Sequence, residues 1–133
     1  MKFLHEDVDL GYYDLEAVTT DKGRHYEDPD GNKYPSITTV LSILSEEAIQ
    51  AWRARVGEEE ANRISTQAST RGTKVHNIIE EYLKNNPDYL KDELPHNIQT
   101  FKDVQPILDE CVTKIYRQEA PLYSKHLGVA GRV

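Results

Sequence analysis

The apolar positions in the middle of the chain recur at helical spacing. Ile37, Val40, Leu41 and Leu44 follow the 3.6-residue period, and they come after Ser36, a residue type that suits a helix N-cap. The same reasoning, with Gly57 as a break, predicts further helices from Glu46 to about Val56, Glu58 to about Ala68, Arg71 to about Lys84, and Asn97 to about Lys114. Residues 36–114 are therefore predicted to be mainly helical.

The last of these helices carries a regular apolar stripe. Its members are Phe101, Val104, Leu108, Cys111 and Ile115. The single cysteine falls in phase with the stripe, so we interpret it as a small buried apolar residue rather than a redox group. Pro106 lies within the pattern, where it predicts either a kink or a later start of the helix.

Strand patterns lie on both sides of the helical region. Residues 12–20 and 24–27 are predicted to pair across a tight turn at 21–23, and a second turn at 28–32 returns the chain into Lys33 and Tyr34. The second turn has carboxylate and amide groups that suit calcium, but it lacks the closing Glu of an EF-hand, so we interpret it as a turn. Residues 115–124 are predicted to be extended, residues 125–128 to turn, and residues 129–133 to start a return strand.

These elements predict an α+β fold in a single domain, residues 1–133. Its expected parts are an N-terminal β-hairpin region (1–35), a helical arch of four to five helices (36–114), and the first strands of an incomplete mixed sheet (115–133). The hydrophobic content of 38% is enough for one modest core. No apolar run is long enough for a membrane span, and the start turns acidic too soon for a signal peptide, so the expected compartment is the cytoplasm.

The charge balance argues at first against nucleic acid. The chain has 16 Lys+Arg and 23 Asp+Glu, a net charge of -7, whereas proteins that bind by neutralising phosphates are usually basic. A nuclease that holds a divalent metal must nevertheless concentrate carboxylates, and it can keep a local basic channel. Several basic residues gather between 53 and 74, interleaved with glutamates, so this stretch is either solvated helix surface or a basic groove.

His76 and Glu80 are the first candidates for chemistry. On a helix from Arg71, the face made by Val75, Ile78, Ile79 and Tyr82 is apolar, and His76 lies on its border, facing the edge of the core. Glu80 follows four residues later, so both side chains can reach one metal ion. A structural histidine explains the same pattern. The other histidines lack ligand-like spacing, so a zinc site is not supported.

Hydroxyl and aromatic residues form the second set of candidates. Ser36, Thr38 and Thr39 at a helix start could seat a phosphate or simply cap the helix. Trp52 could stack on unpaired bases or fill the core. The sequence has no nucleophile elbow, phosphate-binding glycine loop or Cys/His pair, which excludes acyl transfer and nucleoside-triphosphate chemistry.

Four motifs in this order resemble a known family. They are Tyr34-Pro35-Ser36-Ile37-Thr38-Thr39-Val40-Leu41; Trp52-Arg53 with Gly57; Arg71-Gly72-Thr73-Lys74-Val75-His76 with Glu80; and Glu119 to Ser124 with Leu127 to Val133. Together they resemble the RecB-like exonucleases of the PD-(D/E)XK superfamily, and most of all the phage exonucleases and the mitochondrial genome maintenance exonuclease. The resemblance covers about Tyr26 to Val133. It implies a restriction-endonuclease-like sheet and a deoxyribonuclease dependent on Mg²⁺ or Mn²⁺.

The resemblance also implies roles for individual residues. His76 matches a metal ligand, and Glu80 a supporting carboxylate on the same helix. Glu119 and Ser124 match a strand before the active site. The implied phosphate contacts are Ser36, Thr38 and Arg71, with Arg53, Lys74 and Trp52 as further candidate DNA contacts.

The same comparison implies that catalytic residues are missing. Gly131-Arg132-Val133 matches the lead-in to the family's first catalytic aspartate, and the following acidic-x-Lys strand is absent. We therefore expect the N-terminal portion of a nuclease, inactive alone. The alternatives are a non-catalytic module that binds DNA or a protein, one half of a split nuclease, and a plain helical interaction domain. Expected partners are DNA that is single-stranded or has a free end, the nuclease's own C-terminal half, or a second copy paired through the last strand.

Overall fold

The computed structural model describes residues 2–11 and 14–133, and these form two compact units of mixed α and β structure. Unit 1 comprises residues 2–7 and 56–116, and unit 2 comprises residues 8–55 and 117–133. The predicted α+β class is confirmed. The assignment of the whole chain to one domain stays a prediction, because compact units of this kind also occur within single domains.

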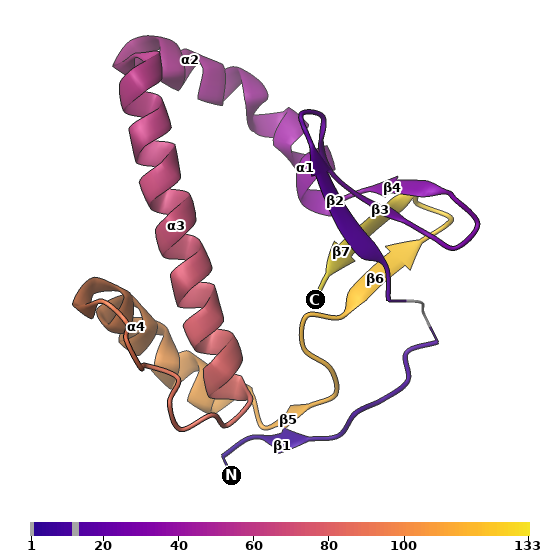
Figure 1. Cartoon of the computed structure of the whole chain (residues 1–133), viewed down its shortest axis with the longest axis vertical. Helices are drawn as coiled ribbons and strands as arrows, with labels where there is room; N and C mark the ends of the chain where they lie inside the picture. The colour runs from indigo at the N-terminus through magenta and orange to yellow at the C-terminus, as the bar shows by residue number, and fades with distance from the viewer. Residues whose placement is uncertain (1, 12–13) are drawn as a thin grey trace. The chain divides into compact units, whose positions relative to one another are not determined.

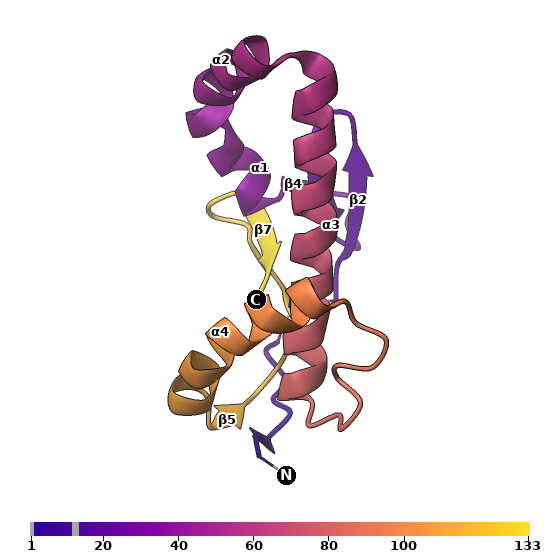
Figure 2. The same ribbon diagram turned by 90° about the vertical axis from the view of Figure 1, so that its left-hand side faces the viewer.

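Unit 1 is built on two long helices and a short parallel pair of strands. Its elements are β1 (Leu4–His5), α3 (Glu58–Leu83), α4 (Pro95–Cys111) and β5 (Lys114–Ile115). Strand β1 pairs in parallel with β5, with Leu4 opposite Lys114 and His5 opposite Ile115. Helix α4 crosses the second half of α3 (Figure 2). Strand β1 is not among the elements predicted from the sequence.

The core of unit 1 forms where α3, α4 and the two short strands meet. Its buried members are Phe3, Ile78, Tyr82, Phe101 and Ile115. The ring of Tyr82 contacts the rings of Phe3 and Phe101 edge to face, with centroids 5.2 and 5.1 Å apart. The predicted apolar face of α3 is confirmed, since Ile78 and Tyr82 are buried while Val75 and Ile79 are half-buried.

Helix α3 is continuous where the sequence analysis predicted two helices. The predicted boundary between Ala68 and Arg71 is wrong, because the 26 residues from Glu58 to Leu83 form one helix. No proline interrupts this stretch, and an interior glycine such as Gly72 costs a helix only about 1 kcal/mol. The break at Gly57 is confirmed, because this residue has a φ of 90°.

The end of the α4 stripe differs from the prediction. The helix starts at Pro95, retains Pro106 inside it, and ends at Cys111, so Ile115 belongs to β5 rather than to the helix. The prediction that Cys111 is buried is wrong, because its thiol is exposed. The half-buried Leu108 and Val112 pack against the core instead, and Cys111 lies between them on the outer side.

Unit 2 holds the remaining strands and the first helices (Figure 1). Its elements are β2 (Glu16–Thr20), β3 (Gly23–Glu27), β4 (Lys33–Pro35), α1 (Ile37–Ser42), a 3₁₀ turn (Ile43–Ser45), α2 (Glu46–Val56, whose last residue belongs to unit 1), β6 (Pro121–Ser124) and β7 (Val129–Arg132). Strands β2, β3 and β4 form an antiparallel meander, and β6 and β7 form an antiparallel hairpin. The predicted N-terminal hairpin and the turn at 125–128 are confirmed. Tyr12 and Tyr13, predicted to begin the first strand, lie outside the described residues.

The core of unit 2 lies between the meander and the β6–β7 hairpin. Leu15, Tyr26, Tyr34 and Ala130 are buried there, and a parallel bridge joins Ser36 to Ala130. The apolar face predicted for the first helix is not buried in this unit. Among its residues, Ile37 is 50% exposed, Leu41 55% and Leu44 85%.

Asp28 organises the turn between β3 and β4. Its carboxylate accepts hydrogen bonds from the backbone N–H groups of Asp30 and Asn32, from the Asn32 side-chain amide and from the Tyr34 hydroxyl. These bonds, with the Asn32 amide first, hold the pKa of Asp28 below its ordinary value, because they favour the charged form. The turn prediction for residues 28–32 is confirmed.

The predicted long strand at 115–124 is interrupted. Strand β5 ends at Ile115 and β6 begins at Pro121. Between them Glu119 has a φ of 51°, which is the left-handed region and incompatible with a continuing strand. The pairing of β6 with β7 nevertheless includes the residue before β6 and the residue after β7, because the backbone groups of Ala120 exchange two hydrogen bonds with Val133.

Candidate metal-ligand pair and groove on helix α3

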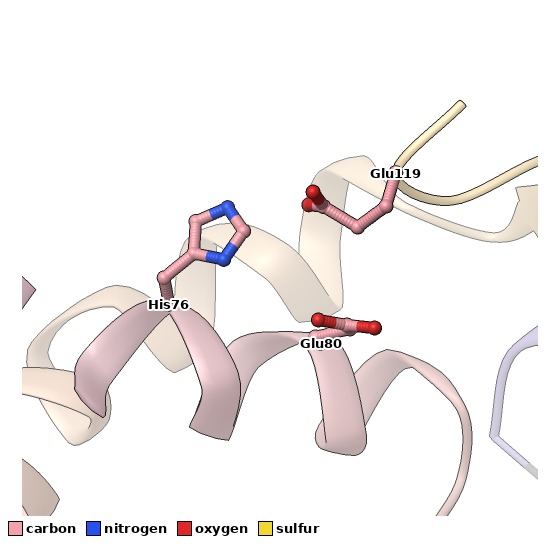
Figure 3. A group of neighbouring side chains, drawn as sticks. All are labelled: His76, Glu80 and Glu119. Atoms are coloured by element: carbon pink, nitrogen blue, oxygen red, sulfur yellow. The ribbon is translucent and has the colours of Figure 1, made fainter. Parts of the chain in front are cut away.

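His76 and Glu80 lie one turn apart on α3 and project to the same side of it (Figure 3). A ring nitrogen of His76 and a carboxylate oxygen of Glu80 lie within 4.8 Å of each other. The i, i+4 spacing produces this approach directly, because successive turns stack such side chains above one another. The predicted juxtaposition of these two residues is therefore present in unit 1.

Their surroundings differ in one respect from the prediction. His76 is exposed rather than directed at the edge of the core, whereas Glu80 is half-buried. A carboxylate oxygen of Glu80 also accepts from Lys84 Nζ at 2.7 Å. This hydrogen bond is the main reason that the pKa of Lys84 lies above its ordinary value.

The donor chemistry of the pair fits a divalent transition metal better than magnesium. Two ligands at about 2.1 Å from one ion lie at most about 4.2 Å apart, so a small rotamer change would let both residues reach one ion. An imidazole with a carboxylate suits manganese or zinc, while Mg²⁺ prefers six oxygen ligands. The pair therefore fits a metal in donor type and provides only part of a coordination shell.

A groove of about 1160 Å³ runs along α3 beside the start of α4. His76 lines it together with Arg71 and Lys74 from α3, and Glu93 and Asn97 line it from the other side. The groove thus carries positive charge from Arg71 and Lys74 on the α3 side, and the carboxylates of Asp92 and Glu93 on the opposite side. Apolar side chains, including Ile64, Val75, Ile79 and Leu94, complete its lining.

The residues that α4 contributes to this groove are not among the predicted site residues. The spacing of His96 to the other histidines is not ligand-like, and Asn97 is predicted only as the start of a helix. A polar run directly after Pro95 at a helix start was the available signal. That signal does not show which helix lies opposite.

Ser36 and Thr38 belong to unit 2, at the start of α1. Ser36 is buried, and its Oγ accepts from the Thr39 backbone N–H at 3.1 Å and bonds to the hydroxyls of Thr38 and Thr39. The N-cap interpretation is confirmed. A phosphate role stays a prediction, and Thr38 is the more accessible of the two hydroxyls because its side chain is exposed. Thr38 also lines a hollow of about 520 Å³ beside the β2–β3 turn.

The remaining candidate DNA contacts are spread over both units. Arg71 and Lys74 are exposed on α3 in unit 1, whereas Trp52 and Arg53 are half-buried on α2 in unit 2. Because Trp52 is only half-buried, its core interpretation and its base-stacking interpretation both stay predictions. Glu119, also drawn in Figure 3, belongs to unit 2 and is half-buried.

Comparisons with protein-family models, with curated proteins and with solved structures found no match to this chain. Among the described residues, no helix combines the length and the apolar character that crossing a lipid bilayer requires.

Proposed function

We propose that this chain belongs to a metal-dependent DNA nuclease of the RecB-like kind and that His76, supported by Glu80, is one of its metal ligands. The observation that carries the proposal is the approach of these two side chains, within 4.8 Å, at a groove that Arg71 and Lys74 also line. A metal-dependent nuclease uses cationic groups to hold the phosphate and a metal ion to activate the water, and the groove offers residues for both. A bound divalent metal lowers the pKa of its water and polarises the phosphate.

The sequence also limits what this chain does by itself. No aspartate or glutamate precedes any of its lysines by two residues, so the acidic-x-Lys motif of the family does not occur in it. One histidine and one glutamate are too few ligands to hold magnesium tightly. We therefore infer that the 133-residue chain contributes to metal and DNA binding and does not cleave DNA alone.

Manganese binding tests the metal-ligand assignment. We expect the chain to bind Mn²⁺ weakly, roughly in the millimolar range, because only two protein ligands converge on α3. His76→Ala should abolish the specific paramagnetic broadening of nearby resonances, and Glu80→Gln should weaken it. His96→Ala is the matched control, since His96 lines the same groove from α4. NMR during Mn²⁺ titration gives the measurement, and equal broadening in the wild-type and His76→Ala proteins would overturn the assignment.

Incubation with labelled single-stranded DNA and Mn²⁺ tests the functional part. We expect binding that weakens as salt rises and no cleavage products. Arg71→Ala should reduce the affinity, whereas Arg63→Ala should change it little, because Arg63 is exposed, lies outside the groove and forms an ion pair with Glu60. Strong metal-dependent degradation by the 133-residue chain would contradict the inference that it is inactive alone. Absence of any DNA binding at low salt would contradict the nuclease proposal.

One observation favours a second candidate, a module that binds a protein partner. The α1 helix and the 3₁₀ turn expose five large apolar side chains, Ile37, Val40, Leu41, Ile43 and Leu44. Contiguous apolar surface of this kind often marks an interaction site. DNA binding that depends on Arg71, together with Mn²⁺ binding that depends on His76, would favour the nuclease over this module.

A further inference from the structure

Asn97 carries a buried polar atom that the fold leaves without a partner. The residue is only 2% exposed, and its Oδ1 has no hydrogen-bond donor among the residues that the structure describes. Its Nδ2 donates only a long bond, 3.4 Å, to Glu93 Oε2. Buried amide oxygens in native proteins nearly always accept a hydrogen bond, so an orphaned one requires an explanation.

The position of Asn97 indicates where a missing donor would come from. Asn97 lines the α3–α4 groove in unit 1, as do Glu93 on the same side and Arg71 and Lys74 on the α3 side. The torsion that turns an amide is soft, and the 3.4 Å bond to Glu93 restrains it weakly. The Oδ1 atom can therefore turn toward the groove and accept a donor from a bound molecule.

The charges of the groove define the chemistry of that molecule. Arg71 and Lys74 favour an anionic group, whereas Asn97 Oδ1 and the Glu93 carboxylate both require N–H donors. Apolar lining from Val75, Ile79 and Leu94 suits the flat face of an aromatic ring. A nucleotide whose base bears an exocyclic amino group combines these three properties. Asn commonly pairs with the adenine amino group, and Glu accepts from the cytosine amino group.

We propose that the α3–α4 groove holds one amino-bearing nucleobase, adenine or cytosine, of a single-stranded DNA and that Asn97 Oδ1 accepts from its amino group. The inference rests on the proposed function, because it assigns the base that accompanies the phosphates held by Arg71 and Lys74. The amino group supplies two hydrogens, enough for both Asn97 and Glu93. Thymine lacks such a group and leaves this pair of acceptors incompletely satisfied.

Asn97→Leu is the informative variant. Leucine has the same heavy-atom branching as asparagine and carries no polar atom, so it removes the orphaned acceptor without opening a cavity. We expect the variant to melt at the same temperature as the wild type or higher. We also expect the wild type to bind oligo(dA) and oligo(dC) roughly tenfold more tightly than oligo(dT), and the variant to lose this preference while keeping its oligo(dT) affinity. Gln99→Leu is the control, because Gln99 is exposed on α4 and does not line the groove.

Fluorescence anisotropy with 12-nucleotide oligo(dA), oligo(dC) and oligo(dT) separates the possible outcomes. Equal affinity for all three in the wild type, or an unchanged preference in Asn97→Leu, overturns the base assignment while the nuclease proposal stands. Absence of binding to every oligonucleotide overturns both. NMR provides an independent readout: adding dCMP should shift the Asn97 side-chain amide resonances and leave those of Gln99 unchanged. If only a water molecule bonds to Asn97 in the wild type, dCMP will not shift these resonances. That result would also overturn the inference.

Discussion

Replacing Phe3 with alanine should destabilise unit 1 by about 3–5 kcal/mol, the range found when a buried phenylalanine is truncated in a well-packed core. Phe3 is 1% exposed and packs edge to face on Tyr82, in the cluster that also holds Ile78, Phe101 and Ile115. Among residues 2–7, which the structure describes, no other residue is buried. Phe3 therefore supplies the buried apolar contact of the β1 segment, beside the backbone bonds to Thr113 and Ile115 and the ion pair between Glu6 and Lys114.

Backbone contacts around Phe3 show why the loss extends beyond one ring. Asn85 accepts from the N–H groups of Lys2 and Phe3 through its Oδ1 and donates its amide to the Phe3 carbonyl. Asn85 itself has a φ of 61°, a conformation that asparagine tolerates better than most residues. Without the Phe3 ring these hydrogen bonds lose their support, and we expect β1 to separate from β5.

Urea unfolding of the full chain, with hydrogen exchange of the β5 and α4 amides, gives the measurement. Leu4→Ala is the control, because Leu4 is adjacent to Phe3 and 60% exposed, so its truncation should cost less than about 0.5 kcal/mol. Exchange rates in unit 2 should change little. A Phe3→Ala protein that matches Leu4→Ala in stability and in β5 exchange would show that β1 does not anchor unit 1.

The case of β1 also shows which parts of the fold the sequence could predict. The β2–β3–β4 meander follows from turn residues and strand patterns within about 20 positions, and it was predicted. Strand β1 has two residues and pairs with residues 110 positions later, so no local pattern indicates it. The single α3 helix was not predicted for a related reason. Gly72 and the polar residues near it suggest a break, but the cost of one interior glycine is small and the helix continues through it.

The same distinction applies to the candidate site. His76 and Glu80 approach each other because of helical spacing alone, so the sequence could pair them. The groove depends on how α4 lies against α3, which the sequence does not indicate. The sequence alone therefore could not predict that Asn97 lines the groove. The exposed apolar face of α1 is the converse case, because a correct helical period did not reveal whether that face is covered.

Gly23→Ala is expected to have the second-largest effect: it should lower the free energy of unfolding of unit 2 by about 2–4 kcal/mol. Gly23 opens β3 with a φ of 106°, and an added Cβ would lie 2.7 Å from Thr39 Cγ2 and 3.0 Å from Thr39 Oγ1. The substitution thus combines backbone strain with a clash against α1. It should also disturb the bond from the Arg24 N–H to Thr39 Oγ1 and the Ser36–Thr39 hydroxyl contact.

Two further variants separate strain from clash. Gly31→Ala has a comparable φ of 82° but nothing within 4 Å of the added Cβ, so it should cost only the backbone term, about 1–2 kcal/mol. Thr39→Ser removes Cγ2 and keeps Oγ1, so the double variant with Gly23→Ala should recover part of the lost stability. The coupling between the two sites, measured by urea unfolding in a double-mutant cycle, reports the contact alone. Gly23→Ala and Gly31→Ala could instead lower the free energy of unfolding equally, with no recovery from Thr39→Ser. That result would show that the β2–β3 turn does not contact α1 closely at Thr39. The Ser36 and Thr38 hydroxyls would then owe their placement to the N-cap of α1 alone, because Thr39 would no longer be fixed from the β2–β3 side.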